Sequence, residues 1–291
     1  MTAYERKGEW LEIRLPSDVP ESFNVSDCAA QYLRLTPKEI ARLSHAAGLE
    51  GKGGRLRARL FPEELPAFEP EWTELDILYE DDFCLVVSKP AGMAVHPGVP
   101  GERGTLAGAM AAYYESTGQP VAVRHIHRLD ADTTGPVLYA KNAYAHVRLD
   151  EAMRRGTIGR TYVAVVSGRV ARDRGTIAEP IGKDRHHAAR RRVSPGGDPA
   201  VTHYEAVERF NAATLVRVRL ETGRTHQIRV HFSHLGHPLL GDSLYGGPKG
   251  PIGRQALHGA SLRFSHPFSQ ELIETECPLP EDFRALLENL K

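Results

Sequence analysis

The segment from His125 to Gly135, HIHRLDADTTG, places two histidines, an arginine and two aspartates beside a short apolar stretch. A loop of this kind at the edge of a strand is a common place for catalytic groups. Asp130 could act there as a nucleophile or general base, and Arg128 could hold a phosphate or order the carboxylate. The same residues also fit an aspartate-rich turn whose side chains bond the backbone. On these residues alone, both interpretations stay open.

A second segment, Glu221–His231, is ETGRTHQIRVH. A strand that passes through a glycine-containing turn into a helix start presents free backbone N–H groups, which together with Arg224 suit an anion. Arg229 lies about one helical turn further on, where it can meet a carboxylate from elsewhere in the chain. The alternative is an amphipathic helix, capped by Thr225 and ended by Gly236, whose arginines are simply at the surface.

Tyr162 lies in a third segment, Gly159–Val166, which is GRTYVAVV. A tyrosine in a strand usually contributes to packing, because aromatic residues favour strands. It can also stack on a nucleic-acid base.

Four histidines, at positions 226, 231, 234 and 237, raise the question of a zinc site. His231 and His234 are three residues apart and therefore share a helix face. Neither a cysteine nor a third ligand at a familiar spacing accompanies them. The pattern therefore favours hydrogen bonds in the core or at helix ends over metal binding.

Charge is distributed unevenly along a chain of 291 residues whose 37 basic and 37 acidic residues cancel. Residues 1–100 carry 11 basic and 17 acidic side chains, a net charge of −6, whereas residues 151–200 carry 11 and 5, a net charge of +6. The basic stretch contains Arg190, Arg191 and Arg192, and we predict that Arg185–Arg192 is a mobile basic loop near a binding cleft. Clustered arginines of this kind neutralise phosphates, although a solvated loop without a ligand has the same composition.

Several classes of protein are not indicated by the sequence. No apolar run approaches the ~20 residues that span a bilayer, and Met1–Trp10 lacks the apolar core of a signal peptide. The three cysteines (Cys28, Cys84 and Cys277) are far apart, which is typical of reduced thiols in a cytoplasmic protein. No phosphate loop, dinucleotide fingerprint or Gly-x-Ser-x-Gly elbow is present.

Three regions are predicted along the chain. Residues 61–71, FPEELPAFEPE, contain three prolines and four glutamates and suit a linker. Residues 1–60 form a small N-terminal region with helices around Val25–Leu33 and Pro37–Ala47, the second capped by Thr36. Residues 72–291 have a mixed α and β pattern and form the large domain.

Apolar periodicity predicts the elements that position the candidate residues. A hairpin joins Ile77–Glu80 to Phe83–Ser88 around two aspartates. A helix begins after Asn142 and ends at Gly156. Further strands are expected at Pro136–Lys141, Thr161–Ser167, Val201–Phe210 and Leu215–Glu221.

Together these segments resemble the RluA-type family of RNA pseudouridine synthases. The resemblance spans roughly residues 75–290 and is carried by ordered motifs: LYEDDFCLVVSKPAGMAVHP (78–97), HRLDADTTG (127–135), GRTYVAVV (159–166), TGRTHQIRVHFSHLGHPLLGDSLYGG (222–247) and ALHGASLRFSHP (256–267). The family isomerises uridine to pseudouridine in structured RNA, such as rRNA or tRNA, without a cofactor or metal. The resemblance implies an α+β fold, with a mixed, largely antiparallel sheet, flanking helices and a central cleft.

The resemblance also implies roles for particular residues. Asp130 would be the catalytic carboxylate, Arg229 would pair with it and orient it, and Tyr162 would stack on the flipped uracil. Arg128 would help to displace the target nucleotide from its stack. The remaining substrate-binding residues are expected to be His127, Arg224, Arg190, Arg191 and Arg192. Many relatives carry an N-terminal RNA-binding domain, of which residues 1–60 would be a degenerate copy.

Two other functions compete with this interpretation. The chain could be a catalytically silent RNA-binding protein, which Asp130, Tyr162 and Arg229 argue against. It could also be a metal-dependent hydrolase that uses its histidines, which metal analysis of purified protein would decide. We expect a cytoplasmic monomer that contacts RNA and no membrane.

Overall fold

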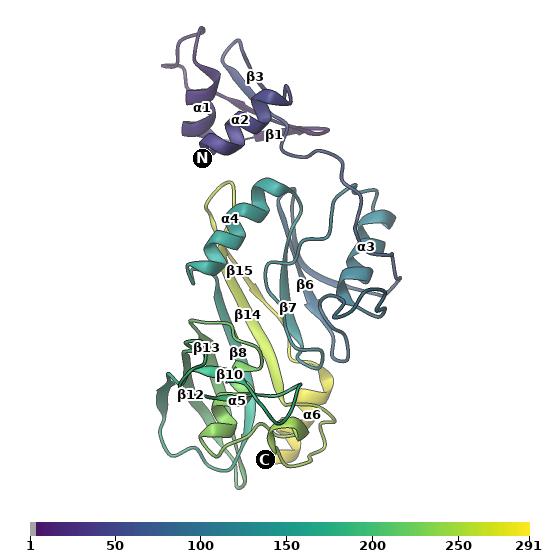
Figure 1. Cartoon of the computed structure of the whole chain (residues 1–291), viewed down its shortest axis with the longest axis vertical. Helices are drawn as coiled ribbons and strands as arrows, with labels where there is room; N and C mark the ends of the chain where they lie inside the picture. The colour runs from purple at the N-terminus through teal and green to yellow at the C-terminus, as the bar shows by residue number, and fades with distance from the viewer. Residues whose placement is uncertain (1–3) are drawn as a thin grey trace.

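The computed structural model describes residues 4–291, and the N-terminal unit lies at one end of its long axis (Figure 1). This unit contains β1 (Tyr4–Lys7), β2 (Trp10–Arg14), α1 (Val25–Tyr32), α2 (Pro37–His45), β3 (Leu49–Lys52) and β4 (Arg55–Ala58). Its strands form an antiparallel sheet in the order β1-β2-β4-β3. The two predicted helices are confirmed, and α2 begins with the predicted capping box between Thr36 and Glu39. The four short strands were not predicted.

The N-terminal unit shares a hydrophobic core with the rest of the chain. The ring of Phe83 lies 5.4 Å from that of Tyr4, 5.3 Å from Phe61 and 5.2 Å from Phe268. Phe83 is fully buried, and aromatic contacts at these distances are favourable beyond the area that they bury. Residues 61–71, which contain no helix or strand, therefore join two regions that pack directly on each other.

Polar contacts fasten the same junction. Arg148 forms an ion pair with Glu39 at 2.9 Å, and the Tyr144 hydroxyl donates to the Leu33 carbonyl at 3.0 Å. Both donors lie on α4 (Ala143–Arg154), which begins at the predicted cap, where the Asn142 side chain accepts the Ala145 N–H at 2.8 Å.

The large domain contains two main sheets. The first has the order β5-β6-β7, and the second has the order β15-β14-β8-β13-β12-β9. Every pairing between these strands is antiparallel, which agrees with the expected α+β fold. The strands are β5 (Asp76–Glu80), β6 (Cys84–Lys89), β7 (Gly135–Ala140), β8 (Gly159–Ser167), β9 (Arg174–Ile177), β12 (Thr202–Arg209), β13 (Ala213–Leu220), β14 (Leu257–Ser265) and β15 (Leu272–Glu276).

Smaller elements cover these sheets. A separate hairpin pairs β10 (Ile181–Lys183) with β11 (Arg191–Val193), and the helices are α3 (Leu106–Ser116), α5 (Gln227–His234), the 3-10 turn η1 (Ser243–Tyr245) and α6 (Glu281–Leu290). Between residues 4 and 291, we find no helix with the length and apolar character of a membrane span.

The two main sheets meet where β7 lies beside β14. Gly135 has φ +134°, and a Cβ atom at this position would lie 2.6 Å from the Cα atom of Gly259. Because no larger residue fits this contact, Gly135 allows the backbones to touch at the point where the segment His127–Gly135 enters β7.

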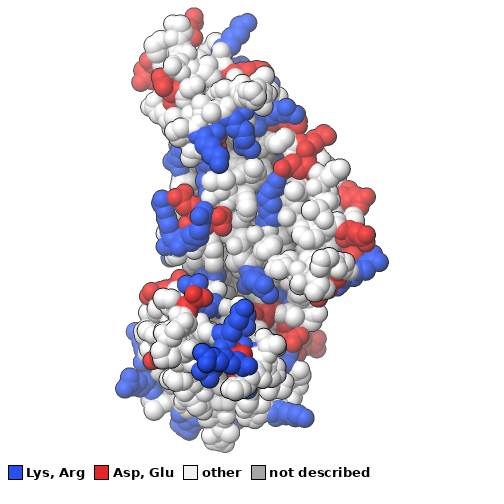
Figure 2. Space-filling model, in the orientation of Figure 1, with Lys and Arg blue, Asp and Glu red and all other residues white. Residues whose placement is uncertain are grey.

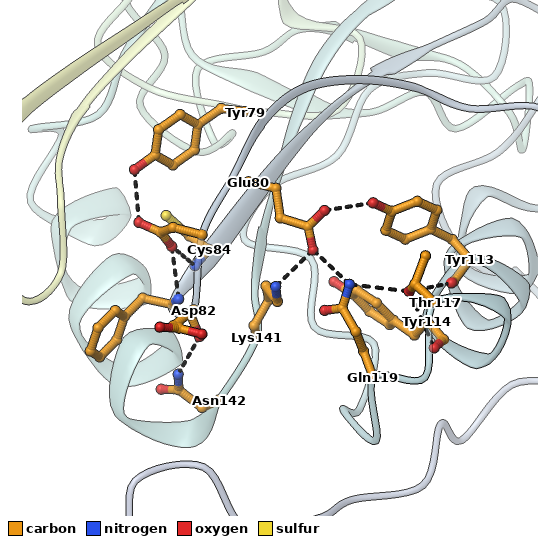
Figure 3. Close-up of polar contacts among 12 residues, drawn as sticks. Tyr79, Glu80, Asp82, Cys84, Tyr113, Tyr114, Thr117, Gln119, Lys141 and Asn142 are labelled. Carbon is orange, nitrogen blue, oxygen red and sulfur yellow. Dashed lines mark hydrogen bonds and ion pairs between the residues drawn. The ribbon is translucent and has the colours of Figure 1, made fainter. Parts of the chain in front are cut away.

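A buried polar network attaches α3 to the three-stranded sheet (Figure 3). Glu80 accepts hydrogen bonds from the Lys141 ammonium at 2.7 Å, the Gln119 amide at 2.9 Å and the Tyr113 hydroxyl at 2.6 Å. Both carboxylate oxygens are therefore satisfied. Burial raises the pKa of Glu80, but the hydrogen bonds from Lys141, Tyr113 and Gln119 outweigh it and leave the pKa below its ordinary value.

Candidate active site

A pocket brings together side chains from three distant segments. It is lined by Asp130 from the loop before β7, Tyr162 from β8 and Arg229 from α5. The guanidinium Nη1 of Arg229 donates to Oδ2 of Asp130 at 3.0 Å, so the predicted contact between these two residues is present. Arg128 and Arg224 also line the pocket and give it a cationic wall.

Two buried cations fix the backbone of the loop that carries Asp130. The Lys89 ammonium donates to the Ala131 carbonyl at 2.6 Å, and Arg254 Nη1 donates to the Asp132 carbonyl at 3.1 Å. Burial lowers the pKa of Lys89 to about 7, while the nearby charges of Asp132 and Asp130 favour its ammonium form. The loop is therefore held by donors aimed at the carbonyls on the C-terminal side of Asp130.

Arg229 is anchored on its far side by a second carboxylate. Its Nε and Nη2 atoms donate to the two oxygens of Asp242 at 2.7 and 2.9 Å. The Asp242 side chain is 1% exposed and that of Arg229 8%. Burial lowers the pKa of Arg229, but the carboxylates of Asp242 and Asp130 outweigh it and raise the pKa above its ordinary value. A bidentate contact of this kind fixes a guanidinium in direction as well as in charge.

Tyr162 forms part of the pocket wall from the middle of β8. Its neighbours in the sheet are Val218 of β13 and Gly259 of β14. The residue is 6% exposed, and burial raises the pKa of its hydroxyl. The backbone of Tyr162 is thus fixed between two strands, and its side chain lines the same pocket as Asp130.

The substrate-binding residues predicted before β7 and before α5 differ in exposure and in their hydrogen-bond partners. Arg128 is exposed, and its Nη1 lies 3.3 Å from Nε2 of His96. Arg224 reaches the Pro199 carbonyl with its Nε at 3.0 Å. His127 does not line the pocket; it is buried, its Nε2 accepts the Leu138 N–H at 3.3 Å, and burial lowers its pKa to about 3.

The predicted basic loop is partly a hairpin. Arg191–Val193 forms β11, and α5 packs against it, so the loop prediction was wrong for these residues. The Arg191 backbone N–H donates to the Tyr245 hydroxyl at 2.9 Å, and the Arg190 guanidinium lies 5.5 Å from the Tyr245 ring. Arg192 is exposed. Figure 2 shows Lys and Arg side chains gathered over this part of the molecule, and none of these three arginines lines the pocket.

Residue His226, rather than Thr225, precedes α5 as its N-cap. Its backbone is left-handed, with φ 58° and ψ 21°, and its side chain does not cap the helix. The Thr225 cap prediction was therefore wrong, because the chain turns into the helix one residue later.

Sequence reasoning missed four residues of the site. Asp242 and Tyr245 lie in the motif GDSLYGG, which only the resemblance to the family singled out. Lys89 is the last residue of the apolar strand β6, and buried strands of this kind usually exclude a charged residue. Arg160 is 8% exposed and lines the pocket. Its Nη1 packs against Gly223, where a Cβ atom, if one were present, would lie 2.7 Å away. A buried charge close to the loop that carries Asp130 is recognisable only once the contacts are known.

Three of the four histidines considered for zinc binding, His226, His231 and His237, make side-chain hydrogen bonds. In His231, Nδ1 contacts the Thr202 hydroxyl at 2.8 Å and Nε2 the Glu179 carbonyl at 2.9 Å. Within residues 4–291, Asp81, Cys84 and His266 are the one cluster with metal-ligand spacing. There Asp81 already accepts the Cys84 N–H at 2.8 Å and lies 2.8 Å from His266 Nε2, as expected for a hydrogen-bonded turn.

Comparison with known proteins identifies relatives of this arrangement. A model of the RNA pseudouridylate synthase family matches residues 83–234. The uncharacterized RNA pseudouridine synthase YhcT of Bacillus subtilis is 48% identical over 237 residues, covering 81% of this chain and 78% of that protein. The ribosomal large subunit pseudouridine synthase D of Haemophilus ducreyi is 42% identical over 263 residues, covering 86% and 81%.

Solved structures show the same fold. Human RNA pseudouridylate synthase domain containing 1 is 26% identical, with a TM-score of 0.58, over 73% of this chain and 87% of that one. Human RNA pseudouridylate synthase domain containing 4 is 24% identical, with a TM-score of 0.61, over 74% and 92%.

Proposed function

This chain belongs to the RluA-type family of RNA pseudouridine synthases, and we propose that Asp130 is the carboxylate that performs the isomerisation. The proposal rests mainly on one observation. Asp130 lines the pocket, and among residues 4–291 only its Oδ2 accepts a side-chain hydrogen bond, from an arginine that is itself fixed by Asp242. A carboxylate held this way is oriented while its other oxygen stays available for reaction.

The reaction converts uridine to pseudouridine without changing its atoms. The N1–C1′ bond breaks, the freed uracil turns, and C5 bonds to C1′; a proton is lost from C5 and one is gained at N1. Asp130 acts as an anion whether it attacks C1′ or removes a sugar proton. Arg229 orients the carboxylate, and the sheet holds Tyr162 where a uracil ring would stack.

The target nucleotide must leave its stack before it can enter the pocket, at a cost of a few kcal/mol. Stacking on Tyr162 returns ~1–3 kcal/mol. Arg128, exposed at the rim, fills the space that the nucleotide leaves, and Arg224 contacts the backbone of the flipped residue. The arginines at 190–192 bind phosphates beside the pocket. His127 supports the loop from behind, since it is buried outside the pocket.

The substrate is structured RNA, and we propose large-subunit rRNA, because relatives at 42% identity are named for that RNA. Residues 1–60 carry 10 basic and 8 acidic side chains, a net of +2, and Lys38 and Arg42 are exposed on α2. We propose that this face contacts the RNA as well. The enzyme acts in the cytoplasm. It acts as a monomer, and sedimentation of the purified protein would test this oligomeric state.

The decisive experiment maps pseudouridine in total rRNA and tRNA from cells that lack this gene. The cells are complemented with wild type or with Asp130→Asn. We expect one or a few sites to disappear, and only wild type to restore them. Restoration by Asp130→Asn would refute the role of Asp130, and loss confined to tRNA would refute the rRNA assignment.

A further inference from the structure

His226 holds a left-handed backbone conformation, which is uncommon for residues other than glycine. Its φ of 58° places it in the left-handed region, where the Cβ atom of an L-residue is crowded. Such conformations persist when surrounding contacts hold them, and they cluster at functional sites. The side chain of His226 is 17% exposed and lines the pocket, so its contacts decide what this conformation is for.

The contacts of Tyr245 allow a neutral tautomer of His226 that carries its hydrogen at Nε2. The Tyr245 hydroxyl accepts the Arg191 N–H at 2.9 Å, and its oxygen lies 2.8 Å from Nδ1 of His226. The hydroxyl hydrogen is free to point at Nδ1, which then acts as the acceptor. A neutral imidazole with an acceptor at Nδ1 carries its hydrogen at Nε2.

Burial lowers the pKa of His226 and favours this neutral form. The charged groups that face the ring act in both directions: Asp130 and Asp242 raise its pKa, whereas Arg229 and Arg191 lower it. The Tyr245 ring contacts it edge-on, with centroids 5.7 Å apart.

Nε2 of His226 points to the unoccupied side of Asp130. The distance from Nε2 to Oδ1 is 3.9 Å, and no hydrogen bond to Oδ1 is present among residues 4–291. A closure of about 1 Å would bring the pair within hydrogen-bond range. Catalytic hydrogen bonds are often long without substrate and shorten in the complex.

We propose that His226 is a positioning residue that donates Nε2–H to Oδ1 of Asp130 when uridine is bound. Two donors then fix the carboxylate, Arg229 at Oδ2 and His226 at Oδ1. Tyr245 sets the tautomer of His226 and connects it to the backbone of the arginine hairpin. This inference rests on the proposed role of Asp130.

Variants at His226 separate the imidazole from the backbone. His226→Gly accepts the left-handed φ and removes the ring; His226→Gln returns an N–H donor at a reach similar to Nε2, whereas His226→Asn is too short. Tyr245→Phe removes the hydroxyl group that contacts Nδ1, so that either neutral tautomer of His226 can form.

We expect His226→Gly and His226→Asn to lower the single-turnover rate at saturating RNA about 10–100-fold. His226→Gln should retain much of the wild-type rate, and Tyr245→Phe should lose less than His226→Gly. RNA affinity should stay within about twofold, and the melting temperature of His226→Gly should not fall.

The controls distinguish two failures. If Asp130→Asn is inactive and His226→Gly reacts at the wild-type rate, the His226 inference is wrong and the role of Asp130 stands. Turnover by Asp130→Asn would overturn the proposed function itself.

Long-range 1H–15N NMR of the wild-type histidines gives a test that does not depend on the folding of any variant. A neutral Nε2–H tautomer for His226 supports the inference, and an Nδ1–H tautomer overturns it.

Discussion

Two buried ion pairs in this enzyme are nearly identical in exposure. The pair of Lys141 and Glu80, at the junction of α3 with the three-stranded sheet, has side chains that are 6% and 20% exposed. The pair of Arg229 and Asp130, in the pocket, has values of 8% and 21%. Burial and charge therefore do not distinguish the structural pair from the proposed catalytic one.

The pairs differ in how completely the carboxylate is bonded. Glu80 accepts three hydrogen bonds that occupy both of its oxygens (Figure 3). Asp130 has Arg229 on Oδ2, while Oδ1 faces the pocket with His226 3.9 Å away. A carboxylate whose oxygens are both hydrogen-bonded stabilises the fold, whereas a carboxylate oxygen without such a bond, held in place by a fixed arginine, can react with a substrate. The cations differ too, because Arg229 is tied to a second carboxylate and is not free to follow Asp130.

Asp130→Asn should give the largest effect on activity. Removing the negative charge takes away the group that attacks or removes a proton, so we expect kcat to fall by at least about 10³-fold. The free energy of unfolding should change by less than about 1 kcal/mol, because Arg229 keeps its bidentate contact with Asp242. Single-turnover assays and urea unfolding measure the two effects. If Asp130→Asn were inactive because it is unfolded, Asp130 would be a structural carboxylate like Glu80.

Asp242→Asn is expected to combine both kinds of effect. It weakens the anchor of Arg229, so the guanidinium loses its direction towards Asp130, and we expect kcat to fall about 10–100-fold with RNA affinity nearly unchanged. Since Asp242 is 1% exposed, the free energy of unfolding should also fall by roughly 1–3 kcal/mol. An unchanged kcat in a destabilised protein would place Asp242 with Glu80, as a purely structural group.

Replacing Arg190, Arg191 and Arg192 with Ala should affect binding and leave the chemical step intact. Each lost phosphate contact flattens the plot of log K against log salt by about 0.9, and we expect weaker RNA binding across sequences. Arg154→Ala with Arg155→Ala is the matched control, because these exposed arginines pair with Asp150 and Glu151 on their own helix. An unchanged salt slope in the hairpin variant would show that it does not touch phosphates.

The sequence predicted the elements that depend on local rules. The Asn142 cap, the capping box of α2 and the hairpin of β5 and β6 all follow from residues within a few positions of one another. The motifs also predicted that Asp130 and Arg229 would meet, although 99 residues separate them. That prediction came from the resemblance, because no local rule brings these residues together.

The features that were missed depend on distant partners. His226 precedes α5 in a left-handed conformation and contacts Tyr245, 19 residues later, whereas a local rule places the cap on Thr225. The strands of the N-terminal unit are only four or five residues long, too short for alternation to show. Asp242 gave no signal of its own, since an aspartate between Gly241 and Ser243 is also an ordinary turn residue.

Glu80→Gln tests the structural side of the comparison, with the smallest expected effect on activity. The substitution leaves Lys141 buried without its counter-charge, so the free energy of unfolding should fall by roughly 1–3 kcal/mol at neutral pH, while kcat stays within about twofold. The folded pKa of Glu80 lies below its ordinary value. Its contribution is therefore complete above the unfolded pKa of about 4.3 and is lost as pH falls through the folded value, where wild type and variant should converge. Urea unfolding of both proteins from neutral to acidic pH measures this difference. A large loss of kcat in a folded Glu80→Gln protein would mean that complete hydrogen bonding does not mark a carboxylate as structural.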